Sequence, residues 1–207
     1  MSAKESCLLR RGAKRTLFAV AFLAVLPLSI VCWLERHFAR NETLFSLCAQ
    51  TLALVPGFPG VYLRSAFYFG ALERCSWETH FGFGTFFTHR GARIGQRVST
   101  GAYCVLGHAQ IGAAAMIGSR VSIPSGRRQH LDEEGRLAPI MRFDVVAIGA
   151  GSWVGEGAIL VANVGEKCIV AAGAIVTRDM PNGCLVAGNP ARVIRAVGPS
   201  SHSTAGT

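Results

Sequence analysis

The sequence is short of charge, and this shortage is its first informative feature. Asp, Glu, Lys and Arg make up 16% of the 207 residues, whereas an average soluble domain has about 25%. Half of the residues are hydrophobic, so the chain is more apolar than an average soluble domain. Its length leaves room for one such domain and an appendage.

Acidic residues are scarcer than basic ones, with 12 Asp and Glu against 21 Lys and Arg and a net charge of +9. A basic balance suits nucleic acid, anionic lipid or a polyphosphorylated ligand. The basic residues are scattered over the ends and loops, and no recognised nucleic-acid-binding motif is present. We therefore expect no nucleic-acid partner.

Paired CxxC spacings are also missing, and the seven cysteines are an odd number. Neither a zinc-binding nor a disulfide framework is indicated. Cys104 and Cys168 fall at small positions of the repeat described below, and Cys32 and Cys48 lie in apolar segments. We expect reduced, buried cysteines, as in a cytoplasmic catalytic domain, and no metal site.

What the sequence does contain is a repeat with a period near six, interrupted once. Six residues are too few for an α-helical unit and fit neither a 3.6-residue nor a 2-residue period. The repeat instead predicts one short strand and one tight corner per unit, with three units forming a coil of about eighteen residues. The expected inward-facing anchors are Ile94, Thr100, Leu106, Ile111, Ile117, Ile123, Ile148, Val154, Leu160, Val164, Val170 and Val176.

Glycine directly follows many of these anchors. We expect this glycine to turn the corner, where a side chain would clash or force a strained backbone. The step from Leu106 to Ile111 is short by one residue, and that from Leu160 to Val164 by two. Gly82–Phe87 is expected to form the first strands. A charged segment, residues 126–144, interrupts the repeat, and long loops on a rigid scaffold often carry function.

The N-terminal part begins with basic residues, and Thr16–Leu34 is then a long apolar run without a charged residue. A helix of this length can cross a bilayer. The alternatives are a signal peptide, for which no small-residue cleavage site follows, and a buried core helix. The positive-inside rule puts the N-terminus in the cytoplasm, and one full span would place the repeat domain outside. We therefore expect a helical hairpin or an in-plane anchor with both ends cytoplasmic.

A second apolar stretch, Thr43–Leu63, is broken by Pro56–Gly60. We expect Thr43–Val55 to form a short helix in the membrane interface or returning through part of the bilayer. The alternative is a helical cap that packs on the first coil. Aromatic residues of the kind favoured at headgroup level lie nearby, namely Tyr62, Phe67, Tyr68, Phe69 and Trp77. The predicted organisation is an anchor at 1–77, a β-domain at 78–196 and a disordered tail at 197–207.

Two closing segments, Ala171–Pro181 and Val186–Arg195, are more specific than any single repeat. With them, residues 82–196 resemble the hexapeptide-repeat acyltransferases. The branch that looks most similar holds maltose, galactoside and nodulation-factor O-acetyltransferases together with xenobiotic acetyltransferases. The resemblance implies a mainly β fold, a left-handed parallel β-helix, here behind an N-terminal α-helical membrane-associating segment. It also implies a homotrimer with active sites between neighbouring prisms.

By this resemblance, His130 in the interrupting segment is the general base. An imidazole titrates near neutral pH and can take the proton of an acceptor hydroxyl as that hydroxyl attacks a thioester carbonyl. Asp132, Glu134 or a backbone carbonyl would orient the ring. The backbone N–H of Glu156 or Gly157 is the implied oxyanion donor.

Acetyl-CoA is the implied co-substrate. Its pantetheine arm would lie over small residues, and arginine side chains suit its phosphates. The implied cofactor-binding residues are Trp153, Ala172, Gly173, Thr177, Arg178, Arg192 and Arg195. Plain packing of Trp153 and solvated surface positions for Arg192 and Arg195 are the alternatives. Some relatives carry an asparagine that faces the acceptor, and the corresponding residues Thr100–Tyr103 include none. The identity of the acceptor is therefore not inferred from the resemblance.

The predicted function is acyl-CoA-dependent O-acylation of a sugar or glycan precursor of the cell envelope or exopolysaccharide. The protein would be membrane-associated, with its catalytic domain on the cytoplasmic side. The alternatives are a xenobiotic acetyltransferase and a non-catalytic trimeric scaffold. A γ-class carbonic anhydrase shares the prism but needs a close pair of zinc-binding histidines, which His89, His108 and His130 lack.

The arginines of the interrupting segment allow two interpretations. They would either meet an anionic acceptor or pair with neighbouring carboxylates and stiffen the segment. The residues concerned are Arg127, Arg128, Arg136 and Arg142, and the carboxylates are Asp132, Glu133, Glu134 and Asp144.

Overall fold

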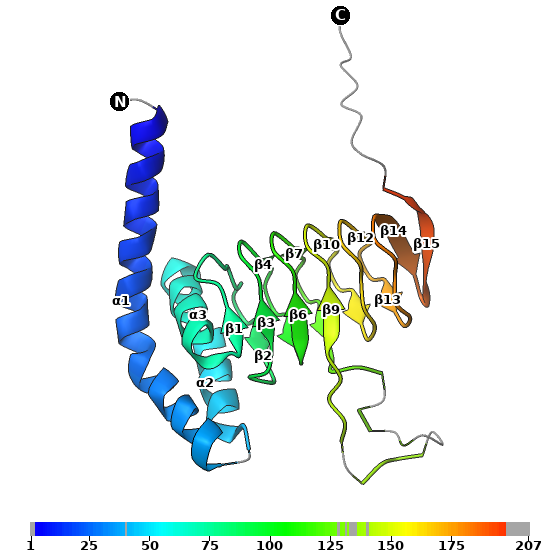
Figure 1. Cartoon of the computed structure of the whole chain (residues 1–207), viewed down its shortest axis with the longest axis horizontal. Coiled ribbons are helices and arrows are strands. Elements are labelled where there is room, and N and C mark those ends of the chain that lie inside the picture. The colour runs from blue at the N-terminus through cyan, green and yellow to red at the C-terminus, as the bar shows by residue number, and fades with distance from the viewer. Residues whose placement is uncertain are drawn as a thin grey trace, which may run out of the picture.

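A computed structural model describes residues 3–39, 41–127, 129, 130, 132, 136–139 and 141–197. Within these residues, helices α1 (Ala3–Phe38), α2 (Thr43–Ala53) and α3 (Gly57–Ala71) precede a series of very short strands (Figure 1). The strands are β1 (Arg74–Cys75), β2 (Phe86–Phe87), β3 (Arg93–Ile94), β4 (Ser99–Thr100), β5 (Val105–Leu106), β6 (Ala109–Ile111), β7 (Met116–Ile117), β8 (Ser122–Ile123), β9 (Val146–Ile148), β10 (Trp153–Val154), β11 (Ile159–Leu160), β12 (Ile169–Val170), β13 (Ile175–Val176), β14 (Cys184–Gly188) and β15 (Ala191–Ala196).

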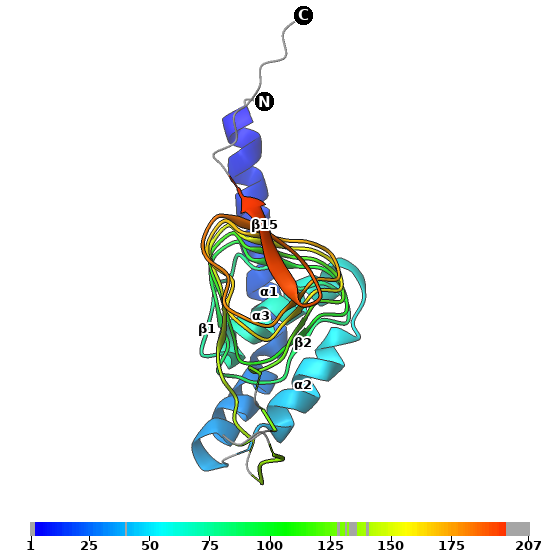
Figure 2. The ribbon, with the colours of Figure 1, turned by 90° about the vertical axis from the view of Figure 1, so that its right-hand side faces the viewer.

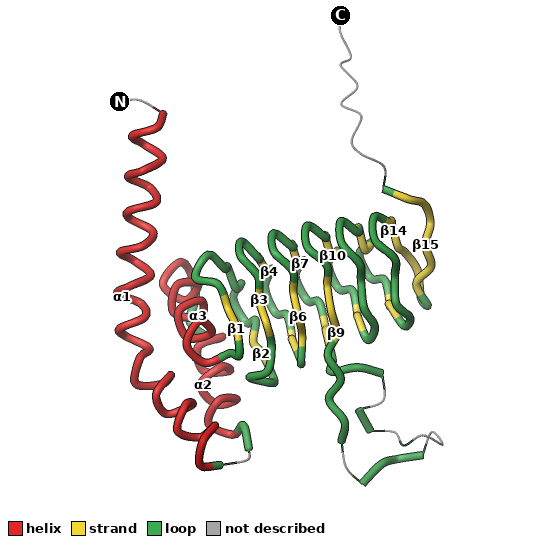
Figure 3. Tube along the Cα trace, in the orientation of Figure 1, coloured by secondary structure: helices red, strands yellow, loops and turns green. Residues whose placement is uncertain are grey.

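The strands form three parallel sheets that enclose a three-sided prism (Figure 2). Sheet I has the order β1-β3-β6-β9, sheet II β15-β14-β12-β10-β7-β4, and sheet III β13-β11-β8-β5-β2. In sheet III, each strand from β2 to β11 pairs with the strand one coil further along the chain, as a parallel β-helix requires. Only β15 pairs antiparallel, with β14, among the described strands. The predicted parallel β-helix is confirmed, and Figure 3 shows how little of each coil is strand.

The predicted start of the β-helix was wrong. The β-helix begins with β1, which pairs with β3 and precedes the expected first strands at Gly82–Phe87. The coil length varies around the expected value of about eighteen residues: Phe86 pairs with Val105, 19 positions later, and the later coils are shorter. The pairing of Ser99 with Met116 falls one position short of that length, and the pairing of Trp153 with Ile169 falls two positions short. The two short repeat steps each remove residues from a coil, so an average over single repeats overstates the coil length.

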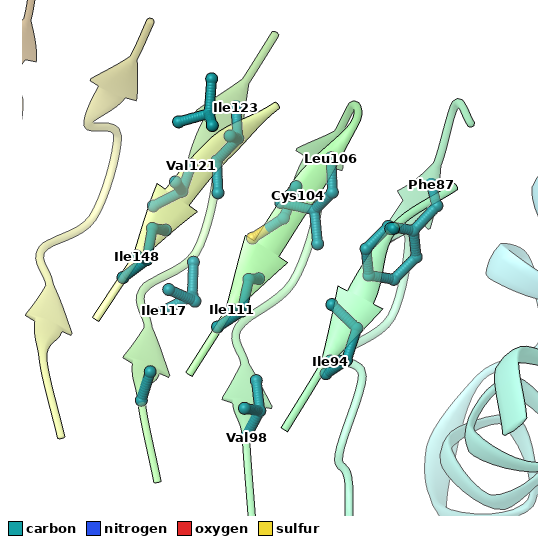
Figure 4. Packing of buried hydrophobic residues seen from close by; sticks show 14 of the residues in the cluster. Phe87, Ile94, Val98, Cys104, Leu106, Ile111, Ile117, Val121, Ile123 and Ile148 are labelled. Carbon is teal, nitrogen blue, oxygen red and sulfur yellow. The ribbon is translucent and has the colours of Figure 1, made fainter. Parts of the chain in front are cut away.

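The anchors of the repeat form the core of the prism. Every one of the twelve is buried, with 4% or less of its surface exposed. Figure 4 shows Leu106, Ile111, Ile117 and Ile123 among the side chains that point into the prism and contact those of the coils on either side. The buried aliphatic column therefore lies where the repeat predicted it, and burying it stabilises the stack of coils.

The glycines that follow the anchors do not have the corner conformation that we expected. A Cβ on Gly149 would lie 2.3 Å from the backbone nitrogen of Glu166 in the next coil, so close packing of coils requires glycine there. The left-handed backbone conformation comes two residues later, as at Arg97 (φ 56°), Arg120 (φ 57°) and Lys167 (φ 52°). A side chain in place of the glycine after an anchor would therefore clash, as expected. The left-handed corner position two residues later, however, is occupied by other residues as well as by glycine.

The helices cover the N-terminal end of the prism. Phe67 and Tyr68 of α3 are fully buried, and the Tyr68 ring packs edge-on against Phe81 and Phe87. These two aromatic residues therefore belong to a helical cap on the first coil and not to a headgroup zone. Phe69, in contrast, is 43% exposed and contacts Phe18 of α1.

Arg64 of α3 lies completely buried inside this cap. Its guanidinium donates to the carbonyl oxygens of Leu52 (3.0 Å) and Val55 (2.8 Å), at the end of α2, and of Phe81 (3.0 Å) in the first coil. Burial lowers the pKa of Arg64 from its ordinary value. One side chain thus caps the free carbonyls at the C-terminus of α2 and fastens the helices to the prism.

Candidate functional site

The segment 126–144 leaves the prism at the corner between sheets III and I. Its two sides are joined by backbone hydrogen bonds from Asp144 N to Ser125 O (3.0 Å), from Arg142 N to Gln129 O (3.1 Å) and from Ala138 N to His130 O (2.9 Å). The described residues of the segment therefore form a folded arm, which projects from the side of the prism (Figure 1). His130 lies on this arm and is exposed.

Three contacts fix the base of the arm. The ring of Phe143 lies 4.2 Å from that of His89, centroid to centroid. His108 Nδ1 lies 3.4 Å from Phe143 O, and Arg127 Nη1 donates to Thr177 O over 2.9 Å. The arm is thus tied both to the coil before it and to a coil after it, which limits the positions that His130 can take.

Asp132 faces Arg136 within the arm. The Arg136 backbone N–H donates to Asp132 Oδ1 (2.8 Å), and its Nε donates to Asp132 Oδ2 (3.2 Å). Arg136 therefore pairs with a neighbouring carboxylate, which is the second of the two interpretations given for the arginines of this segment. Glu134, the other candidate to orient His130, lies outside the described residues, as do Arg128 and Glu133.

A cavity of about 460 Å³ opens at the base of the arm. Asn163 and Asp179 supply its polar wall, since Asn163 Nδ2 donates to Asp179 Oδ2 (3.2 Å) and the Asn163 backbone N–H to Asp179 Oδ1 (3.0 Å). Sequence reasoning missed both residues. The signal was the short step from Leu160 to Val164, which places Asn163 at this corner. The lining is Gly126, Arg127, Asp144, Val145, Val146, Val161, Ala162, Asn163 and Asp179.

The predicted site residues lie at two different corners of the prism. Thr177 and exposed Arg178 follow β13 at the corner of sheets III and I, where the arm also begins. Glu156, Ala172 and Gly173 lie instead at the corner of sheets II and III, where Gly173 N donates to Glu156 O over 2.8 Å. Within one chain, His130 on the arm and the residues of this second corner therefore do not line a common site.

The second corner has room beside its backbone. A Cβ on Gly157 or Gly173 would meet no atom within 4 Å, so the surface there is open to a ligand. The Gly157 N–H donates to Ser119 O over 2.9 Å, which leaves the Glu156 N–H as the better candidate to bind an oxyanion. The Glu156 side chain is exposed and lies 3.9 Å from Arg120, a surface contact worth little.

The remaining candidates share sheet II. Trp153 is 49% exposed, and the strand register places Trp153, Ile169, Leu185 and Arg195 side by side across β10, β12, β14 and β15. Arg192 and Arg195 are exposed, and within the described residues their side chains bond to nearby backbone carbonyls. Both arginines thus lie at the far end of the prism from the helices.

No group of three or more His, Cys, Asp or Glu side chains that could hold a metal ion occurs among the described residues. His89 binds Glu42 through Nδ1 over 2.8 Å, and His108 faces Phe143. These two histidines therefore hold structural contacts at the base of the arm.

Comparison with known proteins identifies the fold. The chain superimposes on a maltose O-acetyltransferase from Clostridium difficile 630 with a TM-score of 0.67 and 20% identity, covering 76% of this chain and 87% of that one. A galactoside acetyltransferase in complex with coenzyme A gives a TM-score of 0.60 and 20% identity, with 78% and 84% covered. The fold is therefore that of hexapeptide-repeat acetyltransferases, and the predicted resemblance is confirmed at this level.

Sequence comparison gives shorter matches. A 2,3,4,5-tetrahydropyridine-2,6-dicarboxylate N-acetyltransferase of Staphylococcus aureus is 40% identical over 85 residues, 41% of this chain and 29% of that protein. The chain spans about a third of the length of the curated relatives it matches. No family model matches the chain.

Proposed function

We propose that this protein is an acyl-CoA-dependent O-acyltransferase that uses acetyl-CoA and a sugar or glycan precursor of the cell envelope or exopolysaccharide. The observation that carries the proposal is the position of His130 on a folded arm that projects from an acetyltransferase-type prism. The arm is anchored at its base through Phe143 and Arg127, as a base that must be held in position requires.

The proposed reaction is direct transfer in a ternary complex. His130 takes the proton of an acceptor hydroxyl while the hydroxyl oxygen attacks the thioester carbonyl. The Glu156 N–H binds the oxyanion that forms. When this intermediate collapses, the carbon–sulfur bond breaks, the new ester remains on the acceptor, and the imidazolium returns its proton to the sulfur of CoA. Asp132 or Glu134 is proposed to orient the ring of His130.

We propose that the active site lies between two prisms of a homotrimer. His130 and the group of Glu156, Ala172 and Gly173 occupy different corners of one chain, which supports a site that one prism completes for its neighbour. Acetyl-CoA would then lie along sheet II and its corner, past Trp153, with its phosphates near Arg192 or Arg195. Thr177 and Arg178, at the base of the arm, would bind the cofactor from the other subunit.

Membrane association is part of the proposal, because the most apolar 18-residue window of the helix segment Gly12–Phe38 has a mean hydropathy of 2.6 and only 22% of that window is buried. A core helix of a soluble protein would be mostly buried. We place the catalytic domain on the cytoplasmic side, where acyl-CoA is available.

The test is a thiol-release assay with acetyl-CoA across sugars, nucleotide sugars, envelope glycans, chloramphenicol and streptogramins. We expect turnover with a sugar or glycan, and His130→Ala should lower kcat by about 10²–10⁴-fold. His80→Ala, an exposed histidine away from the arm, is the matched control. Equal turnover by His130→Ala would overturn the mechanism. Turnover with the antibiotics alone would favour a xenobiotic acetyltransferase. Absence of turnover with every acceptor would favour a non-catalytic scaffold.

A further inference from the structure

Helix α1 has two apolar faces, and the protein covers only one of them. The inner face packs against α3 and α2, and its residues Ala21, Val25 and Cys32 are 7% exposed or less. The outer face is exposed over more than five turns and carries seven large apolar residues. They are Leu17 (53% exposed), Val20 (62%), Leu23 (67%), Ile30 (48%), Val31 (40%), Leu34 (41%) and Phe38 (85%).

The inner face is fastened to the prism at both ends of this segment. Near the start of the segment, Phe18 contacts Trp77 with ring centroids 6.0 Å apart. Near its end, Arg90 of the first coil donates from Nη1 to Cys32 O over 3.2 Å. The apolar segment of α1 therefore runs alongside the first coil and cannot leave it without breaking buried contacts.

This attachment argues against a helix that crosses the bilayer. The first coil carries Glu73, Arg74 and Arg93 on its exposed surface, beside the segment that a span would place in hydrocarbon. Exposed ionised side chains are excluded from that region. Helix α2 cannot complete a hairpin across the bilayer either, since its 11 residues extend about 16 Å against a core of about 30 Å.

The charges at the two ends of the apolar segment fit an anionic lipid surface. Exposed Lys14 and Arg15 precede the segment, with the Arg15 guanidinium 5.7 Å from the centre of the Trp77 ring, and exposed Arg36 lies near its end. The sequence adds Lys4, Arg10 and Arg11 before them. An apolar face framed by basic residues is the pattern of a helix that lies in the plane of a membrane surface, where basic residues attract anionic headgroups.

We propose that α1 binds an anionic lipid bilayer along its outer face, lying in the membrane plane, so that the prism projects away from the membrane. Figure 1 shows α3, α2 and the prism extending from one side of α1, and Figure 2, seen along the prism, shows α1 crossing behind it. The inference rests on the membrane association proposed above. In the proposed homotrimer of side-by-side prisms, three such faces lie at one end and bind together, which multiplies the affinity.

The experiment uses the full chain and vesicles of phosphatidylcholine with or without phosphatidylserine. We expect binding that is at least about tenfold stronger with phosphatidylserine, from about 1 kcal/mol per basic residue near the surface. The double variant Leu23→Glu with Ile30→Glu should lose binding. Val193→Glu, an equally exposed apolar position at the far end of the prism, should retain it. Loss in both variants, or in neither, would overturn the proposal.

Nitroxide labels on Val20→Cys, Leu23→Cys, Ile30→Cys and Leu34→Cys then report the depth of the helix. Uniform shallow depth along the helix is expected, whereas labels deepest at the middle would show a spanning helix and overturn the proposal. Vesicle binding is measured also for His130→Ala, which should bind like the wild-type chain, so that loss of catalysis and loss of membrane binding are separate results. The chain could instead fail to bind lipid and form a larger oligomer that the Leu23→Glu and Ile30→Glu double variant dissociates. This result would show that the outer face binds a second copy of the protein, and it would overturn the proposal.

Discussion

Arg90 donates from Nη2 to Glu35 Oε2 over 2.9 Å, and this ion pair joins α1 to the first coil of the prism. Both side chains are buried, with 11% of Arg90 and 2% of Glu35 exposed. The same Glu35 carboxylate accepts hydrogen bonds from the backbone N–H groups of Leu44 (2.7 Å) and Phe45 (3.1 Å). A residue of α1 therefore caps the N-terminus of α2 and neutralises a buried arginine at the same time.

Replacing Glu35 by Gln is expected to destabilise the protein by about 3 kcal/mol, the lower end of the range for a broken buried pair. The lower end applies because Glu42 also binds Arg90, from Nε to Oε1 over 3.2 Å. Urea unfolding at neutral pH and fixed protein concentration measures the change. Arg36→Gln, on an exposed neighbour, should stay within about 0.5 kcal/mol of wild type. Equal stability of the Glu35 variant would show that the pair adds nothing.

Glu42 should make the stability depend on pH in the acid range. Burial alone would raise its pKa, but the hydrogen bonds from the His89 ring and the Arg90 N–H outweigh this, and its pKa lies below the ordinary 4.5. The native protein therefore binds this proton less readily than the unfolded chain. The resulting stability is complete above about pH 4.5 and is lost as the pH falls through the lowered native pKa.

Urea midpoints measured from about pH 6 down to about pH 3 test this expectation. Glu42→Gln cannot titrate, so its curve should fall less steeply than that of the wild-type chain as acid is added. Parallel curves for the two proteins would show that Glu42 does not contribute to the acid sensitivity.

The repeat made most of the prism predictable, and the reason is local. A coil built from three short repeats needs an inward aliphatic side chain on each face, so Ile148, Val154 and Leu160 could be placed without knowing their neighbours. The Glu35–Arg90 pair could not be predicted, because the partners lie 55 residues apart and meet only through the docking of α1. Aromatic composition likewise could not distinguish buried Phe67 and Tyr68 from residues at a membrane surface.

The candidate site was less predictable than the fold for a related reason. A motif can nominate His130 and Glu156, but their separation onto different corners depends on where each corner lies around the prism. The paired Asn163 and Asp179 carry no motif, and only the stacking of coils brings them together at the cavity. Sequence reasoning thus found residues one at a time, whereas the site depends on how coils stack.

Leu160→Ala tests the aliphatic column directly. Leu160 is fully buried in sheet III, so the change removes its burial and leaves a cavity between rigid coils, and we expect a loss of about 2–5 kcal/mol. Ile159→Ala changes the outward-facing neighbour, which is 37% exposed, and should cost about 1 kcal/mol. Urea unfolding of both variants at one protein concentration gives the comparison. Similar losses would contradict an inward column at this strand.

The last prediction separates the two roles of glycine in the coils. Gly149 has no unusual φ, but an added Cβ would lie 2.3 Å from Glu166 N and 2.4 Å from the Gly165 carbonyl carbon of the next coil. Those atoms belong to backbone, and Gly149 N itself donates to Val164 O over 2.8 Å. Gly149→Ala must therefore push two hydrogen-bonded coils apart. At Gly151 the φ is +66° and the nearest atom, Lys167 Cγ, lies at 3.7 Å, so alanine meets only backbone strain.

Gly151→Ala is thus expected to cost about 1–2 kcal/mol, the usual penalty of a left-handed conformation, and Gly149→Ala distinctly more. Thermal unfolding of the two variants under one set of conditions measures the difference. The ordering follows from geometry, because Arg97 and Lys167 already adopt the left-handed conformation in other coils, whereas a side chain cannot share the space of a neighbouring backbone. If Gly151→Ala destabilised the protein more than Gly149→Ala, the repeat would require glycine for its left-handed corner conformation and not for the close spacing of the coils.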